Sequence, residues 1–191
     1  MGGASVLVEI TQDAHGVVID MVYAGAANFT GHSVYETERC WLHRDVESRL
    51  AKAVALAGLA GVKLKLLDAY RSPQAHEILC RYISDPRYIA DPKRGSNHSR
   101  GVAVDLTLVD AQGREFDMGT PFDAMVEQSH HFHPALAPEV HRNRFLLLGI
   151  MIQAGFVSLN EEWWHYQIPD ARSYPLIRPN DSIATDPDPW R

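Results

Sequence analysis

Hydrophobic and polar positions follow two different periods along this chain, and each period predicts its own kind of element. Over 62–66, apolar residues alternate with lysines, which is typical of a half-buried strand that leads to Asp68. Over 44–59, apolar positions return at helical spacing, and Gly61 follows at the expected end of a helix.

Boundary residues and the same patterns predict the remaining elements. Ser72 and Pro73 are typical of a helix N-cap and a first-turn proline, so a helix is expected to reach residue 83. Another helix is expected over 138–154, with Gly155 at its end. Further strands are expected over 6–10, 17–23, 102–109, 156–159 and 164–168. Because strands and helices follow no regular βαβ order, the predicted fold class is α+β.

Composition and charge narrow the class of protein. The chain has 191 residues, 46% of them hydrophobic, and a net charge of −6 without any run of basic residues. This composition is typical of a globular protein and argues against a nucleic-acid partner, and no apolar stretch is long enough to span a membrane. We expect one domain over 1–180 and an irregular tail over 181–191.

The N-terminal segment and the cysteines bear on location. Residues 1–20 contain no basic segment followed by a long apolar stretch, so no signal peptide is visible and the expected location is the cytoplasm. In a reducing compartment, Cys40 and Cys80 are expected to remain thiols that serve in packing.

Candidate chemistry is concentrated in two short segments. His98 and Asp105 lie close together in the chain, and His165 follows about sixty residues later. Two imidazoles and one carboxylate can hold a divalent metal such as zinc with a fourth position open for water. Glu162 precedes His165 by one helical turn's spacing and could take a proton from that water. The set indicates a zinc hydrolase with one ion per chain.

The predicted strands limit how these residues could meet. Because His98 and Asp105 would face opposite sides of one unbroken strand, His98 must lie on the preceding loop, or a bulge at Gly101 must reset the alternation. A neighbouring strand could bring His165 beside Asp105, with Glu162 on the loop leading into it. The alternative is purely structural: Asp105 as a turn or edge residue and His165 as a buried, hydrogen-bonded histidine.

The motifs around these residues resemble those of a known family. The pattern S-x-H-x-x-G-x-A-x-D at 96–105, followed by E-x-x-H at 162–165, resembles the signature of the zinc D-alanyl-D-alanine metallopeptidases. The chain is also similar to the dipeptidase branch of that family, which includes the vancomycin-resistance dipeptidase. Its matching positions, in the expected order, are Tyr23, 28–31, 68–71, 122–123, 129–131 and 162–165. The resemblance covers roughly residues 6–170.

This resemblance implies a fold and a set of roles. The implied fold is hedgehog/DD-peptidase-like, with a small antiparallel sheet that holds the zinc site and helices packed around it. The implied Zn2+ ligands are His98, Asp105 and His165. Glu162 is implied as the catalytic base, and Arg71 as the residue that faces the scissile carbonyl and stabilises the oxyanion.

Further residues are implied for the two ends of the substrate. Asp123, with Tyr23 beside it, is the candidate for the substrate's ammonium group, and Ser96 is the candidate for its carboxylate. Asp123 could instead be a helix N-cap, and Ser96 a loop hydroxyl. Asp68 is expected to orient Arg71, for which a surface ion pair with Asp68 is the alternative role.

The implied activity is zinc-dependent hydrolysis of the small dipeptide D-alanyl-D-alanine to two molecules of D-alanine. The alternatives are a murein carboxypeptidase or L,D-endopeptidase of the same fold, or a non-catalytic zinc-containing binding protein, against which Glu162 and Arg71 argue. His130, His131 and His133 could suggest a second metal site. Without regular spacing, a second metal site is not expected, and His130 and His131 are expected to hydrogen-bond near the wall of the active site instead.

Overall fold

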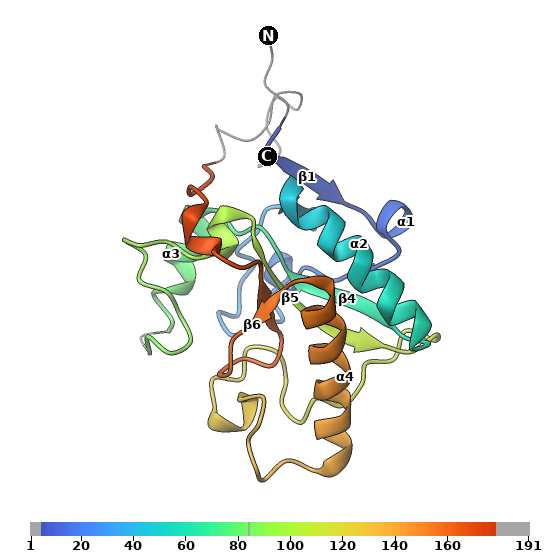
Figure 1. Ribbon diagram of the computed structural model, residues 1–191. Coiled ribbons are helices and arrows are strands. Elements are labelled where there is room, and N and C mark those ends of the chain that lie inside the picture. The colour runs from blue at the N-terminus through green and yellow to red at the C-terminus, as the bar shows by residue number, and fades with distance from the viewer. Residues whose placement is uncertain (1–4, 84, 179–191) are drawn as a thin grey trace.

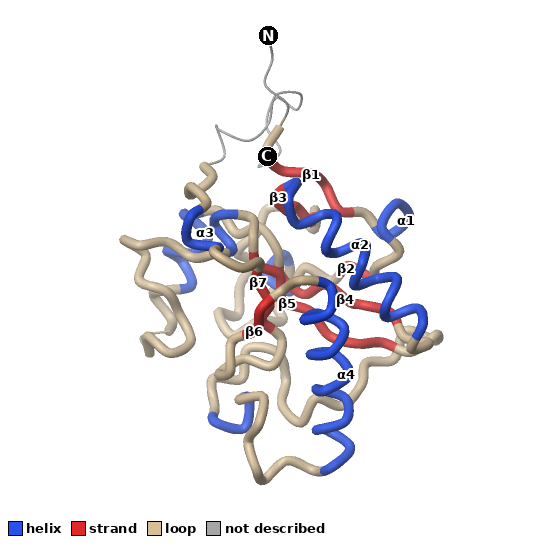
Figure 2. Tube along the Cα trace, viewed as in Figure 1, coloured by secondary structure: helices blue, strands red, loops and turns tan. Residues whose placement is uncertain are grey.

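Two sheets contain the strands of this computed structural model, which describes residues 5–83 and 85–178 (Figure 1, Figure 2). A two-stranded ribbon pairs β1 (Leu7–Ile10) with β3 (Cys40–His43). The five-stranded sheet contains, in spatial order, β2 (Val18–Ile19), β4 (Lys63–Asp68), β5 (Ala103–Val109), β7 (His165–Gln167) and β6 (Val157–Ser158). The predicted tail over 181–191 lies outside the described residues.

Helices complete a mixed architecture, so the predicted α+β class is confirmed. The α-helices are α1 (Gln12–His15), α2 (Arg44–Leu59), α3 (Pro73–Leu79) and α4 (Pro138–Ala154). Short 3-10 helices cover Val22–Ala24, His98–Arg100, Glu127–Ser129 and Ala171–Ser173. Figure 1 shows α2 and α4 side by side, and the apolar sides of both helices pack on one face of the large sheet. This core includes Val46, Leu50, Leu64, Leu66, Val104, Leu106, Leu147 and Met151.

The sheet differs from the small antiparallel sheet that was expected, because its β2 edge is parallel. β4, β5, β7 and β6 pair antiparallel in turn, whereas β2 runs parallel to β4. Between β2 and β4 the chain passes through β3 and α2, and such a long crossover returns the chain in its original direction.

Element boundaries also differ from the sequence predictions at several places. The predicted strand over 17–23 is confined to β2, and a 3-10 helix then turns the chain so that Tyr23 is buried. β3 was not predicted, because its alternation lasts for only four residues. α3 begins at the predicted cap, where the Ser72 hydroxyl accepts from Ala75 N, but it ends at Leu79 rather than near residue 83. The side chains of the next residues are mostly exposed, so they offer no apolar side to bury.

A β-bulge in β4 decides which face of the sheet holds Asp68. Leu66 pairs with Leu106, but the next partners are Asp68 and Asp105, so two residues of β4 span one residue of β5. Without this extra residue, Asp68 would share the helix-covered face of Leu64 and Leu66. The bulge turns Asp68 to the opposite face, beside Asp105.

Candidate active site

The candidate metal ligands meet where β5 and β7 pair. Asp105 lies directly opposite His165 in the antiparallel register, which is the neighbouring-strand arrangement expected from the sequence. His98 precedes β5 in a 3-10 helix that ends at Gly101, where φ is 69°. A Cβ on Gly101 would lie 2.8 Å from Leu7 Cδ2, so this tight left-handed turn requires glycine. The turn, and not a bulge, therefore brings His98 to Asp105.

The three side chains converge on one point in the protein interior. His165 Nδ1 lies 3.0 Å from Asp105 Oδ1 and 3.1 Å from His98 Nε2. His98 Nε2 is 3.4 Å from the same Asp105 oxygen, and all three residues are buried. Within the described part of the chain, this is the group of three ligand-type side chains close enough together to hold a metal ion.

Hydrogen bonds on the outer sides of the imidazoles fix which nitrogen faces inward. His98 Nδ1 lies 2.8 Å from the carbonyl of Ala69, and His165 Nε2 lies 3.1 Å from Gln167 Oε1, which also accepts from Asn97 Nδ2 at 2.7 Å. Because these oxygens only accept, the outer nitrogens donate and the inner nitrogens present lone pairs. Two lone pairs and a carboxylate within hydrogen-bond distance repel one another unless a cation lies between them, so the donor set fits a metal ion.

The Asp105 carboxylate and the His98 imidazole of this group shift one another's pKa values. Burial raises the pKa of Asp105, but His98 and His165 outweigh burial and hold it well below its usual range. Burial lowers the pKa of His98, but the carboxylates of Asp105 and Asp68 together raise that pKa overall. The carboxylate is therefore ionised, as a metal ligand must be.

Glu162 lies on the loop that leads into β7, as expected, and its carboxylate enters the same cavity. Glu162 Oε2 is 3.8 Å from His165 Nδ1. Burial, together with the nearby acids Asp105 and Asp123, raises its pKa to about 8, although His165 acts to lower it. A cation bound by the three ligands would add positive charge and favour the ionised form that can accept a proton.

Arg71 forms an ion pair with Asp68, but this pair is buried and not on the surface. Arg71 Nε and Nη2 donate to Asp68 Oδ2 at 3.0 and 2.6 Å, and Asp68 Oδ1 accepts from Tyr35 and from Ala69 N. The guanidinium also lies 4.0 Å from Asp105 Oδ2. The bulged Asp68 therefore holds Arg71 beside the ligand group, in the position expected of an orienting residue.

The residues expected at the substrate's ends also line this cavity. Tyr23 donates to Asp123 Oδ2 at 2.6 Å, and burial raises the pKa of Asp123 to about 8. Asp123 has a left-handed φ of 59° in a turn that no helix follows, so the N-cap alternative is wrong. The Ser96 hydroxyl oxygen accepts from His98 N at 3.2 Å, which leaves its O–H free to donate into the cavity.

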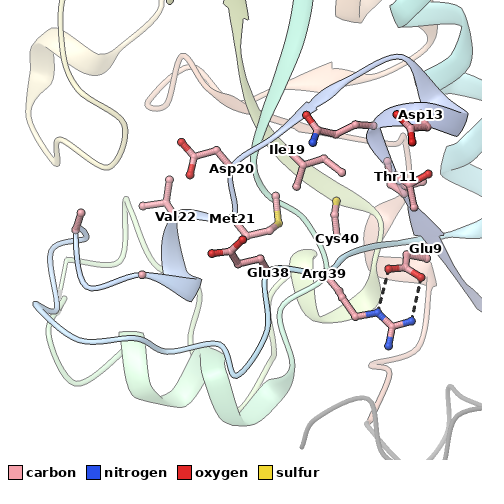
Figure 3. A pocket seen from close by; sticks show the side chains of 14 residues that line it. Glu9, Thr11, Asp13, Ile19, Asp20, Met21, Val22, Glu38, Arg39 and Cys40 are labelled. Carbon is pink, nitrogen blue, oxygen red and sulfur yellow. Dashed lines mark hydrogen bonds and ion pairs between the residues drawn. The ribbon is translucent and has the colours of Figure 1, made fainter. Parts of the chain in front are cut away.

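The cavity that these residues share is small, at about 250 Å³. Pockets for drug-sized ligands usually occupy about 300–1,000 Å³, so this volume favours a ligand smaller than a typical drug. A wider hollow of about 630 Å³ lies between the ribbon and the 19–27 segment (Figure 3). There Glu9 pairs with Arg39, and burial raises the pKa of the Cys40 thiol far above neutrality, so this hollow has neither a ligand set nor an activated nucleophile.

The histidines at 130, 131 and 133 have different surroundings in the structure. His130 Nε2 lies 3.3 Å from the Tyr88 hydroxyl, which lines the cavity wall. His131 is buried against the ring of Tyr166, and neither of its ring nitrogens has a hydrogen-bond partner among the described residues, so the expected hydrogen bond of His131 is not found. Burial lowers its pKa to about 4. His133 Nδ1 accepts from the backbone of its own turn.

Three residues that hydrogen-bond around the site were not predicted from the sequence. Gln167 contacts His165 and Asn97, and Tyr35 donates to Asp68. Gln167 lies two positions after His165 in a strand, so the alternation places both side chains on one face and could have identified it. Asn97 lies inside the motif next to His98. No local pattern connects Tyr35 with Asp68.

Known proteins are similar in sequence to nearly the whole of this chain. Residues 4–180 match the peptidase M15 family, described as D-ala-D-ala dipeptidase. A D-alanyl-D-alanine dipeptidase of Escherichia coli is 44% identical over 187 residues, which cover 98% of this chain and 97% of that protein. The chain belongs to the D-ala-D-ala dipeptidase family. Proteins of the same name from Enterococcus faecium and Streptomyces coelicolor are 35% and 32% identical, covering 82% and 80% of this chain and 88% and 86% of their own lengths.

Membership of this D-ala-D-ala dipeptidase family confirms the expected family and the expectation of a metallopeptidase. The alternative of a non-catalytic binding protein is set aside on the same ground. Among the described residues, no helix has the length and apolar character needed to cross a membrane.

Proposed function

We propose that this protein hydrolyses D-alanyl-D-alanine to two molecules of D-alanine, using one Zn2+ ion held by His98, Asp105 and His165. The observation behind the proposal is the convergence of these three donors with Glu162 and Arg71 in one cavity of about 250 Å³. The sheet that presents this donor set supports a hedgehog/DD-peptidase-like fold, with residues 1–180 as the single catalytic domain.

The metal ion and the Glu162 carboxylate would activate the attacking water together. When bound, the ion supplies positive charge that polarises the scissile carbonyl and lets water ionise near neutral pH. Glu162 accepts the proton of the attacking water at its carboxylate and passes it to the departing amine nitrogen. Burial of Glu162 keeps bulk water away from this proton during the transfer.

Arg71 stabilises the negative charge that develops on the carbonyl oxygen. Its guanidinium is held by Asp68 with Nη2 within 4.0 Å of Asp105, so it is fixed beside the ligand group before substrate binds. Preorganised donors of this kind are typically worth ~10²–10³ in rate. Lysine lacks the planar fork that binds Asp68 through two nitrogens, so it would not hold the same position.

The two charged ends of the dipeptide are matched by opposite groups of the cavity wall. Asp123, oriented by Tyr23, binds the ammonium group, and the Ser96 hydroxyl donates to the carboxylate. A longer peptide would leave one of these groups without a partner, which favours a dipeptide over murein peptides. A cytoplasmic location and a cell-wall origin of the dipeptide remain predictions from the sequence.

The test is the release of free D-alanine from D-alanyl-D-alanine by the purified protein. D-alanyl-D-alanyl-D-alanine and a cell-wall pentapeptide are assayed in parallel, before and after chelation and after addition of zinc. We expect zinc-dependent cleavage of the dipeptide alone. Cleavage of only the longer peptides would replace the proposal with a carboxypeptidase or endopeptidase activity.

A further inference from the structure

The arginines that line the substrate cavity differ in whether their charge is already matched. Arg71 donates twice to Asp68, at 3.0 and 2.6 Å. Arg87 donates three times to Asp85, at 3.1, 3.0 and 2.7 Å. Arg172 lines the same cavity, yet it has no hydrogen-bond or ion-pair partner among the residues that the structure describes. Its guanidinium is therefore available to a ligand.

The backbone that carries Arg172 is anchored in the protein, and the Arg172 side chain lines the cavity. Arg172 is exposed, whereas the preceding residue of its 3-10 helix, Ala171, is 2% exposed and anchors the turn. Ile177 N donates to Ser99 O at 2.9 Å, and Figure 1 shows this red segment beside the green one near residue 99. Arg172 thus belongs to the side of the cavity that also contains Ser96.

A second arginine adds positive charge near Arg172. This is Arg100, which donates to the backbone carbonyls of Arg94 and Tyr174, without a carboxylate partner among the described residues. Burial lowers the pKa of Arg100, and the nearby charge of Arg172 lowers it further, as expected for two cations without an anion between them.

We propose that Arg172 binds the free α-carboxylate of the dipeptide substrate together with Ser96, and so determines that the substrate must end in a free carboxylate. This inference rests on the proposed dipeptidase function. The cavity wall also contains the acids Asp105, Asp123 and Glu162, which repel an incoming carboxylate unless a cation meets it. A guanidinium suits this task because its parallel N–H groups match both oxygens of a carboxylate.

The experiment compares D-alanyl-D-alanine with D-alanyl-D-alaninamide, which lacks the carboxylate charge, on the zinc-loaded wild type and on R172Q. We expect R172Q to raise KM for the dipeptide by about tenfold with kcat nearly unchanged, because a charge-assisted contact made on binding is lost. KM for the amide should stay within about twofold of the wild-type value. R172K should recover part of the loss, and R142Q, an equal charge change on the exposed side of α4, should change neither substrate.

Other outcomes separate this inference from the function on which it rests. Equal losses on both substrates, or an unchanged KM for the dipeptide in R172Q, would overturn the role of Arg172 while leaving the dipeptidase intact. A wild-type protein that cleaves no dipeptide would overturn the proposed function, and the role of Arg172 with it.

Discussion

The metal ligands and Asp123 lie in the same cavity but are held in place by different means. Asp105 and His165 are opposite residues of a strand ladder, and both imidazoles are fixed by hydrogen bonds to nearby oxygens. Asp123 instead lies in the long irregular segment between β5 and α4, in a turn with a left-handed φ of 59°. Regular pairing positions one side of the site, and an irregular loop positions the other.

Arg144, a buried residue of α4, holds the irregular segment in place through hydrogen bonds. Arg144 is 0% exposed and donates to the carbonyls of Met118, Gln128 and His130 at 2.8, 2.9 and 2.7 Å. These carbonyls lie on both sides of Asp123 in the chain. The comparison teaches that strand pairing positions the proposed metal ligands, whereas the segment around Asp123 relies on side-chain hydrogen bonds, among which those of Arg144 come from a distant helix.

The largest effect is expected at the metal end, from E162Q. The amide keeps the shape of the side chain but cannot accept the water proton, so kcat should fall by about 10³-fold. Metal analysis of the purified variant should still find one ion per chain, because Glu162 is not among the three ligands. Near-normal turnover would remove Glu162 as the base.

R144M should destabilise the irregular segment that contains Asp123 without changing the metal content. Loss of the guanidinium leaves three buried carbonyls without donors, and we expect urea denaturation to give a free energy of unfolding lower by about 3 kcal/mol. When R144M is introduced into the wild-type protein, KM for the dipeptide should rise about tenfold. When it is introduced into D123A, KM should not rise further, because the effect acts through Asp123. R142M, on the same helix and exposed, is the matched control. Equal rises in both backgrounds would show that Arg144 does not position Asp123.

The same contrast explains what could be predicted from the sequence. α2 and α4 follow from local periodicity, which acts over a few residues, whereas the pairing of Asp105 with His165 was expected only as one arrangement that the two predicted strands allow. The bulge that turns Asp68 toward the site could not be predicted, because it depends on how β4 pairs with β5. The bonds from Arg144 to the loop leave no sequence signal either, since a buried arginine and a surface arginine look alike in a helix.

His131 is next to His130, whose carbonyl accepts from Arg144, and it should make the stability of the protein sensitive to acid. Burial and, to a smaller extent, the charge of Arg144 lower its pKa to about 4, so the folded state binds this proton less readily than the unfolded state. Its stabilising contribution is then complete above about pH 6.5 and is lost as the pH falls toward 4. Between pH 7.5 and 5, H131Q should lose about 2 kcal/mol less unfolding free energy than wild type in urea denaturation. H133Q, two positions along, should follow wild type; an H131Q curve parallel to wild type would contradict the assignment.

Q167A should produce the smallest effect, since it removes an outer support of the metal end while β7 keeps its backbone pairing. Without Gln167 Oε1, the outer nitrogen of His165 loses its acceptor, so the imidazole is freer to rotate and to place a proton on its inner nitrogen. Zinc affinity, measured by competition with a chromogenic chelator, should fall by about tenfold. Q167E keeps an acceptor oxygen at the same place and should bind zinc at least as well as wild type. An unchanged zinc affinity in Q167A would mean that the strand ladder alone orients His165. The metal ligands would then depend on backbone pairing and Asp123 on side-chain hydrogen bonds.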